Sequence, residues 1–270
     1  MPELPEVETI VRGLRATVIG KTIAGARVFL RKMAVVPAGV SFEKSLAGER
    51  ITGVDRRGKY AILRLKSGRS LVISLRMTGR LVVQKSHETP YPYGHVVLDF
   101  SDKSRLVFAD SRQFGRMRLV DHGEAWDRDL GPEPLSRDFT PERFIGMLSG
   151  RTTPIKVLLL DQRRIAGIGN IYACEALWEA GIRPGKPAKS LSKPAIRRLY
   201  HALVDVLERA VAMRGSSVDD YVDSEGLKGG FQNVLSVYGR AGSECPRCGG
   251  EIVRTVIAQR GTWWCRACQK

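Results

Sequence analysis

Near its C-terminus the chain reads Cys245-Pro-Arg-Cys248-Gly-Gly-Glu-Ile-Val-Arg-Thr-Val-Ile-Ala-Gln-Arg-Gly-Thr-Trp-Trp-Cys265-Arg-Ala-Cys268. Two C-x-x-C pairs separated by sixteen residues are the spacing of a zinc ribbon, in which two tight turns present four thiolates to one metal ion. Residues 251–257 are rich in β-branched side chains and predict a strand, 258–261 predict a turn, and 262–264 predict the returning strand. The intervening residues therefore predict a hairpin with Arg260 at its tip.

The cysteine spacing predicts one structural Zn²⁺ ion. Its expected ligands are Cys245, Cys248, Cys265 and Cys268. The alternatives are iron in the same four-thiolate site, or two disulfides. Disulfides are disfavoured because the N-terminus, Met1-Pro2-Glu3, begins neither a basic nor an apolar segment that would direct the chain to an oxidising compartment. Cys174 is left over, and we predict that it is a buried thiol.

The composition indicates the kind of partner. The chain has 270 residues, with 44 Lys and Arg against 28 Asp and Glu, a formal charge of +16 and a pI near 10. One Zn²⁺ ion bound by four thiolates lowers this charge by only about two. A surplus of positive charge of this size favours a polyanionic binding partner. Since no basic amphipathic helix and no apolar run of membrane-spanning length is evident, we expect nucleic acid rather than a membrane. A merely basic protein is the alternative that charge alone leaves open.

The first half of the chain predicts one helix followed by a β-sandwich. Pro5 suits a first helical turn, and the apolar spacing from Val7 to Leu14 predicts a helix that stops before Gly20. From about residue 23 to residue 120, short β-rich runs alternate with turns, which is typical of a sandwich. The expected runs are 50–56, 59–66, 70–77, 94–100, 105–109 and 114–120.

Helical patterns replace the strands in the second half. Thr140-Pro141 is a helix start signal, and apolar spacing predicts helices over 155–160, 170–180 and 193–213. We predict a linker at 131–141. The glycine-rich stretch Gly215 to Gly230 lacks apolar periodicity, and we predict that it is a mobile loop.

Several familiar motifs are incomplete. Residues 53–59 spell G-x-x-x-x-G-K, but Tyr60 stands where a nucleotide-binding P-loop needs Ser or Thr, and a strand follows. Gly167-Ile-Gly169 lacks the third glycine of a dinucleotide fingerprint, although its amides before a helix suit a phosphate. The four histidines form neither H-E-x-x-H nor a triad. Catalytic metal and serine-hydrolase chemistry are therefore poorly supported.

The N-terminus itself offers a nucleophile. A small second residue such as Pro2 usually permits removal of Met1, which would leave a secondary α-amine. Such an amine has a pKa of about 7.7 to 8.0, so a useful fraction is neutral at neutral pH. It can attack a sugar C1′ and proceed to an iminium, the Schiff-base form of covalent catalysis. Glu3 beside it is placed to relay protons.

Six blocks along the chain resemble bacterial formamidopyrimidine-DNA glycosylases. They are Met-Pro-Glu-Leu-Pro-Glu-Val-Glu-Thr at the start, Arg57-Gly58-Lys59-Tyr60, Leu75-Arg76-Met77-Thr78-Gly79, Asp161-Gln162 with Gly167-Ile168-Gly169-Asn170-Ile171-Tyr172, Val237-Tyr238-Gly239-Arg240, and the ribbon with Arg260-Gly261-Thr262. The blocks run in order from residue 2 to residue 269. The resemblance implies an α+β fold, with an N-terminal helix plus β-sandwich and a C-terminal helical domain that contains a helix-two-turn-helix element and the zinc ribbon. The expected domains are 1–131, catalytic; 141–240, DNA-binding; and 241–270, the ribbon.

The resemblance also implies a reaction and roles for named residues. A damaged purine is flipped from duplex DNA, Pro2 displaces it at C1′, and β- and δ-elimination cut the strand. Glu3 is the implied acid/base, and Lys59 supports elimination. The remaining implied site residues are Asn170 and Arg260, which clamp phosphates beside the lesion, Tyr238, a further backbone contact, and Met77, Arg112 and Phe114, which fill the gap left by the flipped base.

The resemblance implies further expectations and leaves alternatives. A backbone carbonyl near Ser216 to Tyr221 would accept the hydrogen on N7 of 8-oxoguanine. The expected partner is duplex DNA with oxidised bases or abasic sites, bound by a bacterial, cytoplasmic, nucleoid-associated monomer. Leu4 and the long glycine-rich loop favour oxidised purines over the sister glycosylases for oxidised pyrimidines. A catalytically silent DNA-binding protein is the other alternative. Some residues depart from the family pattern. Gln259 and Trp263-Trp264 do so at the hairpin tip, and Ser111 and Gln113 do so around Arg112, where we expect the contact with the opposite base.

Overall fold

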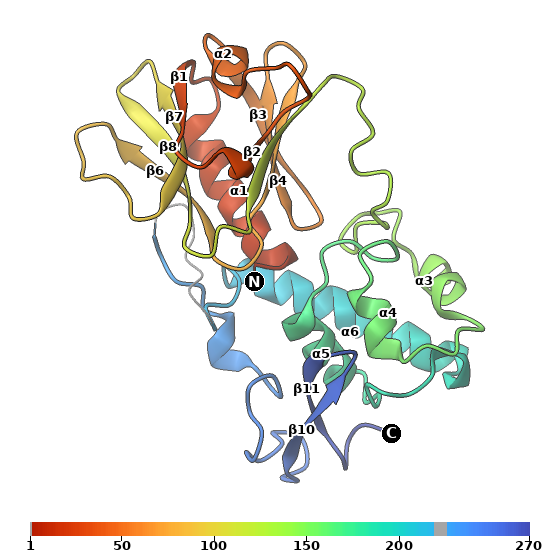
Figure 1. Ribbon diagram of the computed structural model, residues 1–270. Coiled ribbons are helices and arrows are strands. Elements are labelled where there is room, and N and C mark those ends of the chain that lie inside the picture. The colour runs from red at the N-terminus through yellow and green to blue at the C-terminus, as the bar shows by residue number, and fades with distance from the viewer. Residues whose placement is uncertain (1, 219–225) are drawn as a thin grey trace. The chain divides into compact units, whose positions relative to one another are not determined.

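The computed structural model of the protein describes residues 2–218 and 226–270 (Figure 1). The chain forms two compact units, one made of residues 1–128 and 213–230, and the other of residues 129–212 and 231–270. The chain therefore leaves the first unit at Arg128, returns to it at Met213, and ends in the second unit.

Helix α1 (Leu4–Val18) lies against both sheets of the first unit (Figure 1). Glu3 is its N-cap, and Glu3 and Glu6 form a capping box, which satisfies amides at the helix start. Every third or fourth residue from Val7 to Leu14 is fully buried, as the apolar spacing predicts. This stripe contributes to a single hydrophobic core together with side chains from both sheets.

Two sheets enclose this core. The four-stranded sheet has the order β1-β7-β8-β6 and is antiparallel. The five-stranded sheet has the order β2-β9-β5-β4-β3 and is antiparallel except for the β2–β9 pair. The strands are β1 (Ile23–Val28), β2 (Ala34–Val35), β3 (Ile51–Arg57), β4 (Tyr60–Leu65), β5 (Ser70–Ser74), β6 (Gly79–Lys85), β7 (Gly94–Phe100), β8 (Ser104–Asp110) and β9 (Arg116–Val120). A 3₁₀ turn, η1 (Arg31–Met33), and a short helix, α2 (Phe42–Leu46), lie between β1 and β3 in the chain. The predicted sandwich with a helix laid on it is confirmed.

Two expected strands are shorter than the sequence predicts. The run 70–77 ends at Ser74, because Arg76 adopts a left-handed conformation at φ 55° that a strand does not accommodate. The run 114–120 begins only at Arg116, after Gln113 at φ 59°. The sequence analysis also missed β6, which starts directly after the first of these turns.

The second unit consists of helices and a hairpin. Its helices are α3 (Pro141–Leu148), α4 (Ile155–Leu160), α5 (Asn170–Glu179) and α6 (Lys193–Ala212), its 3₁₀ turns are η2 (Ala188–Ser190) and η3 (Phe231–Val234), and its hairpin strands are β10 (Ile252–Ile257) and β11 (Arg260–Cys265). Thr140 caps α3 by accepting a hydrogen bond from the Arg143 amide at 3.2 Å, so the predicted start signal is confirmed. Helix α5 packs against α4, α6 and β11. Among the described residues, no helix is both long and apolar enough to cross a membrane.

Candidate active site and metal centre

The predicted site residues fall in both compact units. Pro2, Glu3, Lys59, Met77, Arg112 and Phe114 belong to the first unit, and Asn170, Tyr238, Arg260 and the four ribbon cysteines belong to the second. Each group is built from different elements. Met1 and residues 219–225, which include Tyr221 of the predicted lesion-reading loop, lie outside the described residues.

The N-terminal residues are held by buried carboxylates. Pro2 is buried and directly precedes α1, and Glu3 is only 3% exposed. Glu6, 1% exposed, accepts the Glu3 amide on Oε2 at 2.7 Å and the Ser216 amide on Oε1 at 2.8 Å. Gly215 takes φ 78° there, and a Cβ at this position would lie 2.7 Å from Glu6 Oε1. The residue next to Pro2 is therefore tied, through one carboxylate, to the start of the glycine-rich loop.

Lys59 occupies the tip of a tight hairpin in the same unit. Arg57 pairs with Tyr60 across β3 and β4, which leaves Gly58 and Lys59 as a two-residue turn. Gly58 takes φ 56°, the conformation that such a turn requires at its first central position. The expected run 59–66 therefore begins one residue later, at Tyr60, and Lys59 lies in the turn at the end of the hairpin.

The three predicted gap-filling residues lie on two turns. Met77 is half-buried in the turn between β5 and β6, and Arg112 and Phe114 are exposed in the turn between β8 and β9. Phe114 is 51% exposed, and the Arg112 guanidinium lies 5.0 Å from the centre of its ring. Met and Phe at strand ends are usually core side chains, but neither Met77 nor Phe114 is fully buried here.

Asn170 lies at the start of α5 and contacts the zinc hairpin. Its Nδ2 donates to the Gly261 carbonyl at 3.0 Å. Lys156, fully buried on α4, donates from Nζ to the same carbonyl at 2.9 Å and to Thr262 Oγ1 at 2.7 Å. Two helices thereby fix the backbone immediately after Arg260. Lys156 was not predicted from the sequence as a residue of this site, because it lies in the apolar segment 155–160.

Tyr238 is held by its backbone and by its ring. Glu175, buried on α5, accepts the amides of Ser236 at 2.8 Å, Val237 at 3.0 Å and Tyr238 at 2.8 Å. The Tyr238 ring lies 4.4 Å from that of Trp263 on β11, centre to centre. Burial raises the pKa of Glu175, an effect that these amide donors oppose. Sequence reasoning did not identify Glu175 either.

The hairpin tip differs from the predicted turn. Ile257 pairs with Arg260, so the turn is the two residues Ala258 and Gln259, at φ 47° and 59°. Left-handed conformations at both central positions define a type I′ turn, in which glycine is favoured at the second position. Arg260 is therefore the first residue of β11, exposed and adjacent to the tip.

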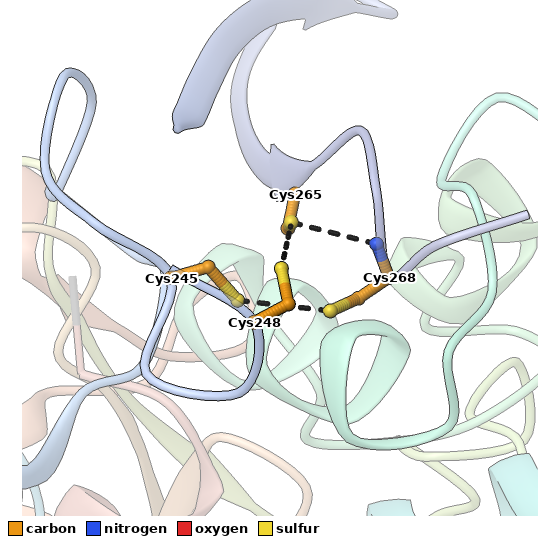
Figure 2. Close-up of side chains that lie close together, drawn as sticks. All are labelled: Cys245, Cys248, Cys265 and Cys268. Carbon is orange, nitrogen blue, oxygen red and sulfur yellow. Dashed lines mark hydrogen bonds between the residues drawn. The ribbon is translucent and has the colours of Figure 1, made fainter. Parts of the chain in front are cut away.

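The four predicted zinc ligands converge on one point (Figure 2). Their sulfur atoms all lie within 4.8 Å of one another, with Cys245 and Cys268 3.8 Å apart and Cys248 and Cys265 3.6 Å apart. Four thiolates about 2.3 Å from a tetrahedral Zn²⁺ ion would be about 3.8 Å apart. The arrangement fits one structural zinc ion.

The acid–base behaviour of these thiols supports a cation. Burial opposes ionisation of Cys245, but a hydrogen bond from Trp178 at 3.4 Å and backbone N–H donors lower its pKa to about 6. Burial and the neighbouring thiols raise the pKa of Cys268 to about 12. Cys245 and Cys268, whose sulfur atoms are 3.8 Å apart, therefore ionise together only when a cation offsets their mutual repulsion. Cys174 is not one of the four converging thiols, although it packs in the same hydrophobic cluster as Cys245 and Cys265. It is fully buried, and burial raises the pKa of its thiol to about 11, which confirms the predicted buried thiol.

Family models match almost the whole chain. Residues 1–117 match the formamidopyrimidine-DNA glycosylase N-terminal domain, residues 130–222 its H2TH domain, and residues 242–270 the zinc finger found in FPG and IleRS. The chain belongs to the formamidopyrimidine-DNA glycosylase family. The resemblance inferred from the sequence and the predicted fold class, including the helix-two-turn-helix element and the zinc finger, are thereby confirmed.

Individual members of the family match over their full length. The formamidopyrimidine-DNA glycosylase of Chloroflexus aggregans is 46% identical, with 100% of this chain and 98% of the relative covered. That of Heliobacterium modesticaldum is 46% identical, with both chains covered completely. Among solved structures, the Thermus thermophilus FPG protein is 43% identical with a TM-score of 0.89, covering 99% of this chain and 98% of its own. The Lactococcus lactis enzyme in complex with abasic-site DNA is 35% identical with a TM-score of 0.92, covering 99% of both chains.

Proposed function

We propose that this protein is a base-excision repair enzyme that removes oxidised purines from duplex DNA and cleaves the resulting abasic strand. The observation that carries the proposal is full-length membership of the glycosylase family, combined with an N-terminal proline beside the buried Glu3. A relative from Lactococcus lactis was solved with DNA containing Fapy-dG, an opened purine, and another complex contains an abasic site. Both kinds of DNA are the expected substrates here.

The proposed chemistry begins at Pro2 once Met1 is removed. The neutral amine attacks C1′, the bond from C1′ to the base nitrogen breaks, and the base leaves with that electron pair and a proton. Glu3 protonates the ring oxygen O4′ as the sugar opens, which leaves an iminium between Pro2 and C1′. Loss of a C2′ proton then expels the 3′ phosphate, and a second elimination expels the 5′ phosphate. Hydrolysis of the iminium returns the amine.

Three residues are proposed to hold the DNA backbone. Lys59 and Arg260 would each neutralise a phosphate, and Asn170 would donate to one from the start of α5. Tyr238 is proposed as a further backbone contact. Its restraint by Glu175 and Trp263 supports this role, because a preorganised contact loses little entropy on binding.

The turn residues and the loop are proposed to handle the flipped base. Met77, Arg112 and Phe114 would fill the gap that the base leaves. A backbone carbonyl near Ser216 to Tyr221 would accept the N7 hydrogen that 8-oxoguanine has and guanine lacks, and the wrong base would leave a buried acceptor unsatisfied at about 1–3 kcal/mol. The expected monomeric state and nucleoid-associated location remain predictions.

The zinc ion has a structural role in this proposal. A small hairpin buries little apolar surface of its own, so metal ligation would supply much of its folding free energy. The cysteines would hold the ion, and the ordered hairpin would present Arg260 to the DNA.

The substrate class is tested by single-turnover cleavage of matched duplexes. We expect faster excision from a duplex with 8-oxoguanine than from one with dihydrouracil, and no excision from undamaged DNA. The comparison matters because a Lactococcus lactis relative was also solved with DNA containing an oxidised pyrimidine. Faster cleavage of dihydrouracil would assign the chain to pyrimidine repair, and binding without cleavage of any duplex would support the catalytically silent alternative.

The phosphate contacts are tested by salt dependence. Arg260→Ala should weaken binding to damaged and undamaged duplexes alike, and it should reduce the slope of log K against log salt by about one. Arg266→Ala, which removes the same charge from an exposed position near the hairpin, is the matched control. Equal slopes in the two variants would show that Arg260 does not reach a phosphate.

A further inference from the structure

Two turns of the first unit connect its two sheets. Residues 75–78 lead from β5 to β6, and residues 111–115 lead from β8 to β9. The strands that flank the turns are hydrogen-bonded to each other, β5 to β9 and β6 to β8. The turn that carries Met77 and the turn that carries Arg112 and Phe114 therefore lie next to each other.

Both turns contain backbone that requires support. Arg76 at φ 55° and Gln113 at φ 59° are non-glycine residues in the left-handed region, which such residues adopt only when their surroundings hold them there. At Gly79 an added Cβ would lie 2.3 Å from the Leu75 carbonyl oxygen. The turns are thus tightly specified, and something must fix them in these conformations.

One buried carboxylate bonds to both turns. Asp110, 1% exposed, accepts the Thr78 hydroxyl and the Arg112 amide (3.1 Å) on Oδ1, and the Gly115 amide (2.7 Å) on Oδ2. Thr78 Oγ1 also accepts the Arg112 amide at 3.1 Å. The first turn is thereby joined to the second through Thr78, and the second turn is closed on itself from Arg112 to Gly115.

Two of the three side chains carried by these turns face water. Phe114 is 51% exposed and Arg112 packs against its ring, whereas Met77 is half-buried. Exposed side chains have no packing of their own to fix them, so their positions depend on the backbone below. That backbone is the part fastened by Asp110 and Thr78.

We propose that Asp110 and Thr78 are positioning residues that clasp the two turns into one rigid element. The clasp presents Met77, Arg112 and Phe114 to the DNA together, so that no free energy is spent on ordering them when a base is extruded. The inference rests on the proposed function, in which these three side chains fill the gap. Neither Asp110 nor Thr78 contacts the reacting atoms in this account.

The clasp is tested by comparing two reactions: excision from a duplex, in which the three side chains must fill the gap left by the extruded base, and cleavage of single-stranded DNA, in which there is no such gap. Thr78→Val keeps the side-chain shape but removes the hydroxyl, and Thr78→Ser keeps the hydroxyl. For Thr78→Val we expect excision of 8-oxoguanine from a duplex to slow at least about tenfold, because the variant loses both hydrogen bonds of the hydroxyl, the one to Asp110 and the one from the Arg112 amide. Cleavage of an abasic site in single-stranded DNA should keep its rate, because no gap forms there. Thr78→Ser should restore duplex excision.

A double-mutant cycle gives a second, independent measurement. If Thr78 and Asp110 act through one hydrogen bond network, Thr78→Val combined with Asp110→Asn should slow duplex excision no more than the worse single variant. Additive effects, or equal losses on duplex and single-stranded substrates, would overturn the clasp and leave only a role in folding. A wild-type protein without excision activity would instead refute the proposed function and not the clasp.

Discussion

The hydrogen bonds of Glu175 predict how much stability the protein loses when this side chain is replaced. Its carboxylate accepts three backbone amides, those of Ser236, Val237 and Tyr238. Glu175→Ala removes both acceptor oxygens and leaves three amide donors without this partner, of which that of Val237 is buried and those of Ser236 and Tyr238 are half-buried. At up to about 1–3 kcal/mol for each unsatisfied donor, the expected loss is at most about 3–9 kcal/mol. Glu175→Gln keeps one oxygen for Val237 and Tyr238 but turns its side-chain NH2 group, a donor, toward the Ser236 N–H, so a loss of about 1–3 kcal/mol is expected. The alanine variant should therefore lose up to about three times as much.

The pH dependence of this loss has a definite sign. Burial raises the pKa of Glu175 in the folded protein. Above its ordinary pKa of about 4.3, the unfolded chain releases a proton that the folded chain still holds, so the contribution of this group to stability falls as the pH rises. Glutamine does not titrate. The stability advantage of the wild type over Glu175→Gln should therefore be larger near pH 4.5 than at pH 8.

Urea unfolding followed by tryptophan fluorescence measures both effects. Three of the four tryptophans, Trp178, Trp263 and Trp264, lie in the second unit, so the signal reports mainly on the unit that contains Glu175. Glu179→Ala is the matched control, because Glu179 is on the same helix but exposed, with an ion pair to Arg209 at 3.5 Å. Such surface pairs contribute about 0–1 kcal/mol. Equal, small losses for Glu175→Ala and Glu179→Ala would refute the reasoning.

Three further predictions follow from single positions. Gln259→Gly should stabilise the zinc hairpin by about 0.5–1 kcal/mol, because Gln259 adopts a left-handed conformation at φ 59° that glycine adopts without strain. Slower hydrogen exchange of the β10 and β11 amides would show this stabilisation, and unchanged exchange would mean that the turn carries no strain. The Cys174 thiol, with its pKa raised to about 11, should resist alkylation at pH 8 in the folded protein and react after denaturation, as mass spectrometry would detect; rapid labelling of the native protein would contradict its burial. Removal of zinc with a chelator should abolish the protection of amides in residues 245–268 from hydrogen exchange and should weaken DNA binding, and Cys265→Ser should have the same effects. The amides of the β-sandwich should stay protected. Tight DNA binding by the zinc-free protein would exclude a structural role for the ion.

Local patterns made part of the structure predictable. The C-x-x-C pairs identify the metal site because each pair acts within four residues, and the apolar spacing of α1 and α6 identifies their buried faces. A turn near Gly58 was likewise expected between the runs 50–56 and 59–66, although the sequence pattern assigned Lys59 to the second strand and not to the turn. The N-terminal proline was informative only through its chemistry and the family resemblance, because nothing local distinguishes it from an ordinary helix start.

The residues that support the site were not predictable in this way. Ser216 bonds to Glu6 across 210 residues of sequence, and Thr262 bonds to Lys156 across 106. Thr78 and Asp110 are 32 residues apart, and their hydrogen bond fastens a turn that strand propensity alone assigns to β5. Buried polar side chains of this kind become visible only when the fold brings their partners together, since their own sequence neighbourhoods are apolar or unremarkable.

Covalent trapping is the most direct test of the central claim, that the Pro2 nitrogen attacks the sugar of an oxidised purine nucleotide. The protein is mixed with an 8-oxoguanine duplex in the presence of borohydride, which reduces an iminium to a stable amine. The adduct is then digested and mapped by mass spectrometry. We expect an adduct of protein and DNA that forms with 8-oxoguanine but not with guanine, with the sugar attached to an N-terminal peptide that begins at Pro2. The absence of an adduct, or an adduct that maps to a lysine such as Lys59, would show that the Pro2 nitrogen is not the nucleophile.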